Sequence, residues 1–210
     1  MKTKILAAAL CLAIIMSTAA YAAPSPGDSA RASVVIEAES GNIIFEKNAH
    51  ERKGPASTTK IMTALVALEK GDPEDIVKID ARAVGTEGSS AYLCAGESVV
   101  LSDLLYAMML GSANDAAAAI AYHIGGSIEG FAGMMNARAE EIGLSDTHFE
   151  NPHGLDGESH YTSAYDLAMI AREALKNEKF REIVSTKTKA IKLSDGNVSR
   201  VFRNHNRLLF

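Results

Sequence analysis

The sequence predicts an α+β fold from the order of its strand-like and helix-like segments. Two β-like runs open the region after residue 31, helix-like segments fill most of residues 57–176, and β-like residues return near the end. Strands and helices that segregate along a chain are typical of α+β folds rather than of alternating α/β folds. A chain of 210 residues is long enough to bury the core of one domain.

The first residues have the pattern of a secretory leader. Lys2 and Lys4 precede an uncharged stretch over residues 5–16, and Ala20-Tyr21-Ala22 supplies a small-residue cleavage site. These features predict a signal peptide, with an uncleaved anchor as the alternative, although the apolar stretch is too short to span a bilayer. We therefore expect an exported, secreted or extracytoplasmic protein. The expected parts are a signal peptide (1–22), a linker rich in Pro, Gly and Ser (23–31) and a catalytic domain (32–210).

Charge and cysteine content narrow the class of protein. The formal net charge is −5, and removal of a leader that contains Lys2 and Lys4 takes it to −7. This acidic balance disfavours a nucleic-acid partner, which would require a basic face. Cys11 falls in the leader, so only Cys94 remains, and we expect it to be a small, partly buried residue without an internal disulfide.

The first elements after the linker are a hairpin and a helix. Residues 33–38 and 42–46 are β-like, and Glu39-Ser40-Gly41 between them favours a turn. A helix-period apolar stripe predicts a helix over residues 57–70, which Gly71-Asp72-Pro73 ends.

The middle of the chain predicts three further helices. Residues 76–100 have a mixed pattern, after which Ser102-Asp103 is expected to cap a helix that ends at Gly111. An Ala-rich helix is expected over residues 114–124, and a helix capped by Ser127 is expected to reach Ile142.

Residues 144–161 form a long polar segment, and loops of this length are uncommon unless they are functional. Its three histidines lack an H-E-x-x-H pattern or a cysteine cluster, so we expect loop hydrogen bonding rather than a metal site; they are His148, His153 and His160. Thr162-Ser163 is expected to cap a helix to Lys176, and a β-like pair flanks residues 194–197.

Ser57 and Lys60 have a spacing that suits nucleophilic catalysis. Residues three apart share one face of a helix, so the amine of Lys60 can take the proton of the Ser57 hydroxyl. The lysine must then be neutral, and lowering its pKa from about 10.4 toward 7 requires roughly 4–5 kcal/mol of environmental bias, such as desolvation. The structural alternative is that Ser57 caps a helix and Lys60 is solvated.

Ser112-Ala113-Asn114 lies at the break between two predicted helices, where side chains can point into a cleft. Ser112 is suited to relay a proton, and the amide of Asn114 can bind an amide substrate because it both donates and accepts hydrogen bonds. The structural alternative is that both residues are helix caps.

Together the two motifs resemble those of the D-alanyl-D-alanine carboxypeptidases, low-molecular-mass penicillin-binding proteins related to the serine β-lactamases. The resemblance runs from about residue 32 to residue 209. The residues that carry it are Pro55-Ala56-Ser57-Thr58-Thr59-Lys60, Gly96-Glu97 ahead of Asp103-Leu104-Leu105, Ser112-Ala113-Asn114-Asp115-Ala116, Met135-Asn136, Thr147-His148-Phe149, Asn151-Pro152-His153-Gly154-Leu155 and Asn204-His205-Asn206-Arg207-Leu208-Leu209.

This resemblance implies a β-lactamase/transpeptidase-like fold, in which an antiparallel sheet packs on a helical cluster. It implies that Ser57 is the acylated nucleophile, Lys60 its general base, Ser112 the proton relay and Asn114 a substrate-binding residue. The implied activity is removal of the terminal D-alanine from peptidoglycan stem peptides, with β-lactam antibiotics as covalent inhibitors and with no metal or organic cofactor. The alternatives are a β-lactamase and a truncated, non-catalytic wall-binding or penicillin-sensing module.

One family motif is expected but absent from the sequence. A Lys-Thr-Gly strand should follow Asn206-Arg207-Leu208-Leu209 closely, and Lys187-Thr188-Lys189 lacks the glycine and comes too early. We therefore expect the sequence to be a fragment that lacks the C-terminal strands of the sheet, with a natural truncation of low activity as the alternative. A membrane anchor beyond residue 210 is compatible with either.

Overall fold

The computed structural model describes residues 29–192 and 198–210, so the expected signal peptide (1–22) and most of the linker lie outside the described residues. The described strands are β1 (Ser33–Ile36), β2 (Ile43–Lys47), β3 (Ile76–Lys78), β4 (Ser98–Val100), β5 (Thr188–Lys192) and β6 (Val198–Arg203). The helices are α2 (Lys60–Lys70), α3 (Leu101–Gly111), α4 (Asn114–Gly125), α5 (Ile128–Ile142), α6 (Ala164–Ala174) and α7 (Glu178–Ser185), with 3₁₀ turns η1 (Ala56–Thr59), η2 (Ala81–Ala83) and η3 (Arg207–Leu209).

The described strands form three antiparallel pairs, β1–β2, β3–β4 and β5–β6, so the α+β class is confirmed. The predicted first hairpin is present, with Val35 opposite Phe45. The carboxylate of Glu37 orders its turn by accepting hydrogen bonds from the backbone N–H groups of Glu39 (2.9 Å) and Ser40 (2.6 Å).

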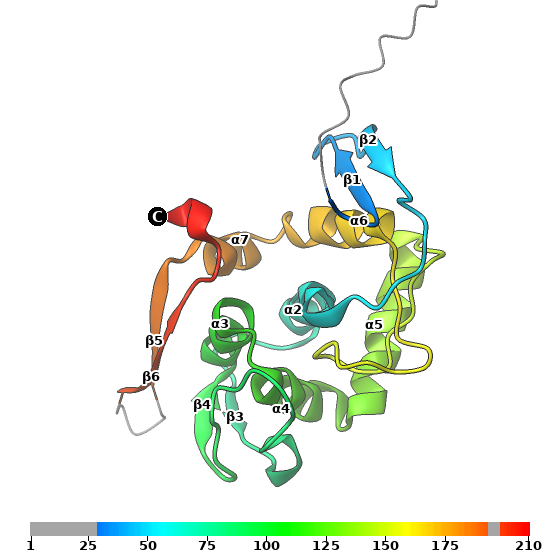
Figure 1. Ribbon diagram of the computed structural model, residues 1–210. Coiled ribbons are helices and arrows are strands. Elements are labelled where there is room, and N and C mark those ends of the chain that lie inside the picture. The colour runs from blue at the N-terminus through cyan, green and yellow to red at the C-terminus, as the bar shows by residue number, and fades with distance from the viewer. Residues whose placement is uncertain (1–28, 193–197) are drawn as a thin grey trace, which may run out of the picture. The chain divides into compact units, whose positions relative to one another are not determined.

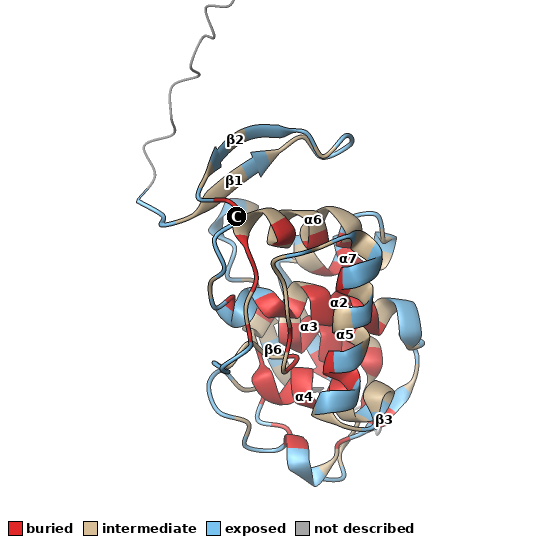
Figure 2. Ribbon diagram, turned by 90° about the vertical axis from the view of Figure 1, so that its right-hand side faces the viewer, coloured by how far each residue is buried: buried red, intermediate tan, exposed pale blue. Residues whose placement is uncertain are grey.

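The core lies in the helical part, where α3, α4, α5 and α6 surround α2 (Figure 1). Buried residues concentrate in α2, α3 and α4, whereas much of the β1–β2 hairpin is exposed (Figure 2). The alanines at 116–119 of α4 are at most 2% exposed, and their small side chains let neighbouring helices approach closely. None of the helices in the described residues is long and apolar enough to cross a membrane.

Helix caps follow the predictions at two positions and differ at a third. Ser127 and Ser163 accept hydrogen bonds at the starts of α5 and α6, as predicted. The cap predicted at Ser102-Asp103 is wrong, because α3 already begins at Leu101. The carboxylate of Asp103 instead accepts the backbone N–H of Lys192 at 3.1 Å, so a tertiary contact replaces the local one.

Two further features differ from the sequence-based expectations. Helix α7 was not anticipated; Asn177 caps it by accepting the backbone N–H of Phe180. Cys94 was expected to be partly buried but is exposed. It lies in a tight surface turn, where its backbone N–H donates to the carboxylate of Glu97 at 2.9 Å.

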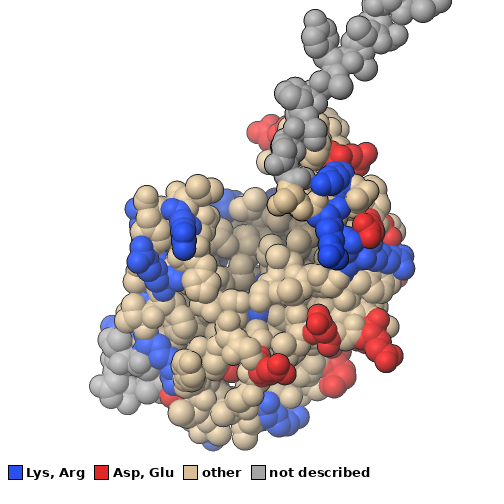
Figure 3. Space-filling model, in the orientation of Figure 1, with Lys and Arg blue, Asp and Glu red and all other residues tan. Residues whose placement is uncertain are grey.

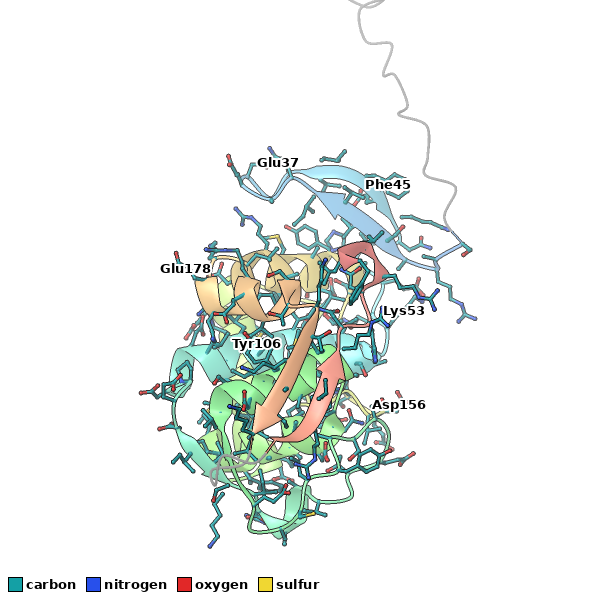
Figure 4. The ribbon with its side chains drawn as sticks, turned by 90° about the vertical axis from the view of Figure 1, so that its left-hand side faces the viewer. Glu37, Phe45, Lys53, Tyr106, Asp156 and Glu178 are labelled. Carbon is teal, nitrogen blue, oxygen red and sulfur yellow. The ribbon has the colours of Figure 1, made fainter. Side chains whose placement is uncertain are left out.

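The β5–β6 hairpin packs against α3, close to the helix end that precedes Ser112. Tyr106 of α3 lies beneath this hairpin (Figure 4), with the ammonium of Lys189 4.5 Å from its ring centre. Phe202 of β6 contacts Gly111 so closely that a Cβ at residue 111 would lie 2.5 Å from the ring. The hairpin therefore bears directly on the backbone at the end of α3.

Candidate active site

Ser57 lies in the 3₁₀ turn η1, which leads directly into α2 at Lys60. Ala56 adopts a left-handed conformation (φ 48°), so the chain turns sharply just before Ser57. The side chain of Ser57 is exposed, whereas Lys60 is 2% exposed. The Nζ atom of Lys60 lies 3.2 Å from Ser57 Oγ, so the expected proximity of the two groups is observed.

The amine of Lys60 is shielded from water and hydrogen-bonded. Its Nζ donates to the carbonyl oxygen of His153 at 2.6 Å as well as to Ser57. Burial lowers the pKa of Lys60 from 10.5 to about 8. About one tenth of the amines is then neutral at pH 7, against fewer than about one in a thousand for a lysine with an ordinary pKa.

The shielding comes from residues 150–160, the tip of the long polar segment. Thr63 Oγ1 of α2 donates to the Pro152 carbonyl at 2.6 Å, and Thr59 Oγ1 pairs with His160 Nε2 at 2.9 Å. Gly154 (φ 87°) lies against η1, where a Cβ would fall 2.5 Å from the carbonyl carbon of Ala56 and 2.9 Å from Thr59 Oγ1. Only glycine allows this approach.

The base of the same segment is fastened to α5 and α6. Asn136 of α5 exchanges two hydrogen bonds of 2.8 Å with the backbone of Phe149. The buried carboxylate of Asp166 in α6 accepts from the Asp146 backbone N–H and the Thr147 hydroxyl, each at 2.8 Å. The length of this segment predicts a functional role, but the His153 carbonyl is not predictable from the sequence, because a backbone acceptor has no sequence signature.

Ser112 terminates α3 in a left-handed conformation (φ 57°), which turns its side chain out of the helix. Its Oγ donates to Ser57 Oγ at 3.0 Å. Ser112, Ser57 and Lys60 thus form one continuous chain of hydrogen-bonding groups, assembled from residues 55 positions apart.

Asn114 is the first residue of α4 and is 5% exposed. Its Nδ2 donates to the Glu87 carbonyl at 2.6 Å, while Oδ1 is buried and has no hydrogen-bond partner among the described residues. The neighbouring carboxylate of Asp115 holds residues 90–93 by accepting from Ser90 Oγ (2.7 Å) and from the backbone N–H groups of Ala91 (2.8 Å) and Leu93 (3.1 Å). The structure thus places Asn114 beneath the segment before β4, and its free acceptor is Oδ1.

The histidines of the loop make hydrogen bonds within the protein. His148 Nδ1 lies 2.7 Å from the Ser159 carbonyl. Burial, with a smaller contribution from Lys60, lowers the pKa of His153 to about 4. In Figure 3 acidic side chains lie mainly at the right and lower right of the molecule, and Lys and Arg lie both at the left, over β5–β6 and η3, and at the upper right. No group of three His, Cys, Asp or Glu residues in the described part of the chain could hold a metal ion.

Comparisons with known proteins agree on one family. The family profile described as D-alanyl-D-alanine carboxypeptidase matches residues 18–210. The carboxypeptidase DacF of Bacillus subtilis is 42% identical over 162 residues, which are 75% of this chain and 42% of that protein. The Escherichia coli carboxypeptidase DacA is 38% identical over 197 residues, which are 84% of this chain and 48% of that protein.

Solved structures give the same result. A D-alanyl-D-alanine carboxypeptidase from Mycobacterium tuberculosis superposes with a TM-score of 0.84 at 31% identity, over 90% of this chain and 72% of that one. The carboxypeptidase DacD from Francisella tularensis gives 0.75 at 35% identity, over 84% of this chain and 44% of that one. The chain therefore spans less than half the length of DacF and DacA, and most of the length of the mycobacterial structure.

Proposed function

This chain belongs to the D-alanyl-D-alanine carboxypeptidase family, and we propose that it is the part of a serine carboxypeptidase that carries the nucleophile. The proposed substrate is a peptidoglycan stem peptide that ends in D-Ala–D-Ala, and the proposed product is free D-alanine. The observation that carries this proposal is the hydrogen-bonded chain Ser112–Ser57–Lys60, in which burial lowers the lysine pKa to about 8.

In the proposed acylation, neutral Lys60 accepts the hydroxyl proton of Ser57 while Oγ attacks the carbonyl carbon between the two D-alanines. The C–N bond then breaks, and the leaving amine takes a proton that Ser112 passes on from Lys60. A positioned general base contributes roughly 10²–10⁴-fold to such a step. Water subsequently hydrolyses the acyl ester on Ser57 and restores the hydroxyl.

Asn114 is proposed to bind the peptide backbone of the substrate. Its Oδ1 is a free acceptor, and Nδ2, which gives one hydrogen to the Glu87 carbonyl, has a second hydrogen to donate, so both groups that an amide requires are present. Because a buried polar atom without a partner costs free energy, a substrate N–H that reaches Oδ1 would be favoured there.

The same proposal covers where the protein acts and how its chain is divided. We propose that residues 1–22 direct export and are removed, that residues 23–31 link them to the domain beginning at residue 32, and that the enzyme acts outside the cytoplasm. The peptidoglycan substrate supports this location, because stem peptides are reached from that side of the membrane.

Covalent labelling tests the proposal. The full-length protein that carries this sequence should form a stable adduct with fluorescent penicillin and should release D-alanine from a peptide ending in D-Ala–D-Ala. Ser57→Ala should abolish both, whereas Ser185→Ala, an exposed serine of α7, should change neither. Labelling that survives Ser57→Ala would reject Ser57 as the nucleophile, and rapid turnover of penicillin without D-alanine release would indicate a β-lactamase.

A further inference from the structure

His160 is buried (5% exposed) and forms hydrogen bonds through both ring nitrogens to two different segments. Its Nδ1 accepts the backbone N–H of Glu150 at 3.0 Å, and its Nε2 lies 2.9 Å from Thr59 Oγ1. Since a backbone N–H can only donate, Nδ1 must carry no proton. The ring is therefore the neutral tautomer in which Nε2–H donates to the Thr59 hydroxyl.

The position of Thr59 gives this bond its significance. Thr59 is the last residue of η1, lies between Ser57 and Lys60 in the chain, and is 1% exposed. One histidine thus joins the turn that carries the nucleophile to the loop whose His153 carbonyl accepts from the Lys60 amine.

We propose that neutral His160 is a positioning residue for acylation. Its bridge between Glu150 and Thr59 keeps residues 150–160 seated on η1 and α2, and this seating excludes water from the amine of Lys60. The inference rests on the proposed function, because it takes Lys60 as the base that activates Ser57. His160 acts through Thr59 and the loop, not by contact with the substrate or with Ser57.

The surroundings of His160 favour the neutral ring. Burial is the largest cause that lowers the pKa of His160, and His148 lowers it further, whereas Glu150 and Asp156 raise it. Phe149 covers the ring edge-on, with ring centres 5.8 Å apart. Two further ionisable groups lie close by, His153 on the loop and Lys60 on α2, and burial lowers the pKa of both.

Protonation of His160 would break the bridge. A proton on Nδ1 would face the backbone N–H of Glu150, so two donors would oppose each other where a hydrogen bond now forms. The charged ring would lose its bond to Glu150 and keep Nε2–H as a donor, so the ring must move away from the Glu150 N–H; that movement would strain the bond to Thr59 and let water reach Lys60. Residues 150–160 therefore stay packed on η1 only at a pH at which the His160 ring is uncharged.

The test is the pH dependence of acylation by fluorescent penicillin. The full-length wild-type protein should show an acid limb with a midpoint near pH 8, the pKa of Lys60. Thr59→Val removes the hydroxyl, and His160→Asn retains an acceptor for Glu150 but is too short to reach Thr59. Both should move the midpoint upward by about one pH unit or more, with the limiting rate at high pH largely kept.

Three further variants separate positioning from general destabilisation. Thr59→Ser keeps the hydroxyl and should keep the wild-type midpoint. His123→Gln changes a histidine of α4 that pairs with Asp75 outside this loop, and it should also leave the midpoint in place. The double variant Thr59→Val/His160→Asn should shift no further than either single variant, because both remove the same bond.

An independent measurement distinguishes this inference from the proposed function. In protein labelled with ¹³C-lysine, the Lys60 Cε resonance, assigned by its loss in Lys60→Met, reports the lysine pKa without any reaction. A wild-type protein that takes no label would overturn the proposed function, while the titration would still decide whether His160 sets the protonation of Lys60. Rates that fall equally at every pH in Thr59→Val and His160→Asn, with an unchanged Lys60 titration, would overturn the inference.

Discussion

The segment with Ser57 and Lys60 and the segment with Ser112 and Asn114 are held in place by different parts of the chain. The first is held by residues 150–160, which approach it from about a hundred positions downstream. The second is held by its own left-handed turn at Ser112, by the segment 87–93 and by Phe202 of β6.

This difference separates two requirements of the site. The loop shields an amine, so its displacement should change the protonation of Lys60 as well as the geometry. The contacts at the end of α3 fix only where a hydroxyl points, so their displacement should change geometry alone. The loss of acylation rate caused by displacing the first region should therefore depend on pH. The loss caused by displacing the second region should be the same at every pH.

The largest expected effect is that of Gly154→Ala, which tests the first region. A Cβ at this left-handed position would collide with the Ala56 carbonyl and force the loop off η1. We expect the rate of penicillin acylation at pH 7 to fall by about 10² or more, because small displacements of reacting groups already cost that much and the lysine is rehydrated as well. The loss should shrink as the pH is raised toward 10.

Gly126→Ala is the matched control for this prediction. Gly126 is also left-handed (φ 72°), in the turn between α4 and α5, but a Cβ there would meet nothing within 4 Å. It should cost roughly 1–2 kcal/mol of stability from backbone strain and leave acylation unchanged. Equal losses of acylation in both variants would mean that strain, not loop seating, explains the effect.

The next largest effect is expected from Gly111→Ala in the second region. The added methyl would lie 2.5 Å from the Phe202 ring, so β6 or the end of α3 must shift and Ser112 with it. We expect acylation to fall by about tenfold at every pH, since one hydrogen-bonding group is misplaced while Lys60 stays buried. Phe202→Leu in the same protein should restore most of the rate by making room.

Gly133→Ala is the control here, because residue 133 lies in α5 with open space around it. It should stabilise the protein by about 0.5–1 kcal/mol through helix propensity and leave the rate unaltered. A Gly111→Ala defect that Phe202→Leu does not relieve would show that the β5–β6 hairpin does not position Ser112.

Local sequence signals predicted most of the elements but few of the contacts that assemble the site. The hairpin, the helix starts at Ser127 and Ser163 and the break at Gly111 each depend on neighbouring residues, and all are present. The cap at Ser102-Asp103 failed because Asp103 serves a strand almost ninety residues away. A single sequence contains no signal for such a partner.

The same distinction applies within the candidate site. The spacing of Ser57 and Lys60 was readable because both lie within one helical turn, and the length of the segment 144–161 predicted a functional role for it. The acceptor for Lys60 is a backbone carbonyl, and the partner of Thr59 is a histidine 101 positions away, so neither was readable. The sequence predicted which groups are candidates for the reactive ones, and only the structure shows the contacts that bury the Lys60 amine.

The smallest predicted effect concerns stability and follows from that pKa. The folded-state pKa of Lys60, about 8, lies below the ordinary value of 10.5, so the unfolded chain binds more protons between these values. Burial of Lys60 therefore destabilises the fold most at low pH, and the penalty declines as the pH rises toward 10.5. Between pH 7 and pH 9 the wild type should gain about 1 kcal/mol of unfolding free energy relative to Lys60→Met.

Urea unfolding of both proteins at the two pH values measures this difference, and all other ionisable groups cancel in the comparison. Lys70→Met, which removes an exposed lysine at the other end of α2, is the matched control for loss of a lysine. Parallel stability curves for the wild type and Lys60→Met would mean that burial does not lower the pKa of Lys60. The pH-dependent loss of acylation expected for the Ser57–Lys60 region would then have no physical cause. That region and the Ser112–Asn114 region would differ only in which parts of the chain hold them.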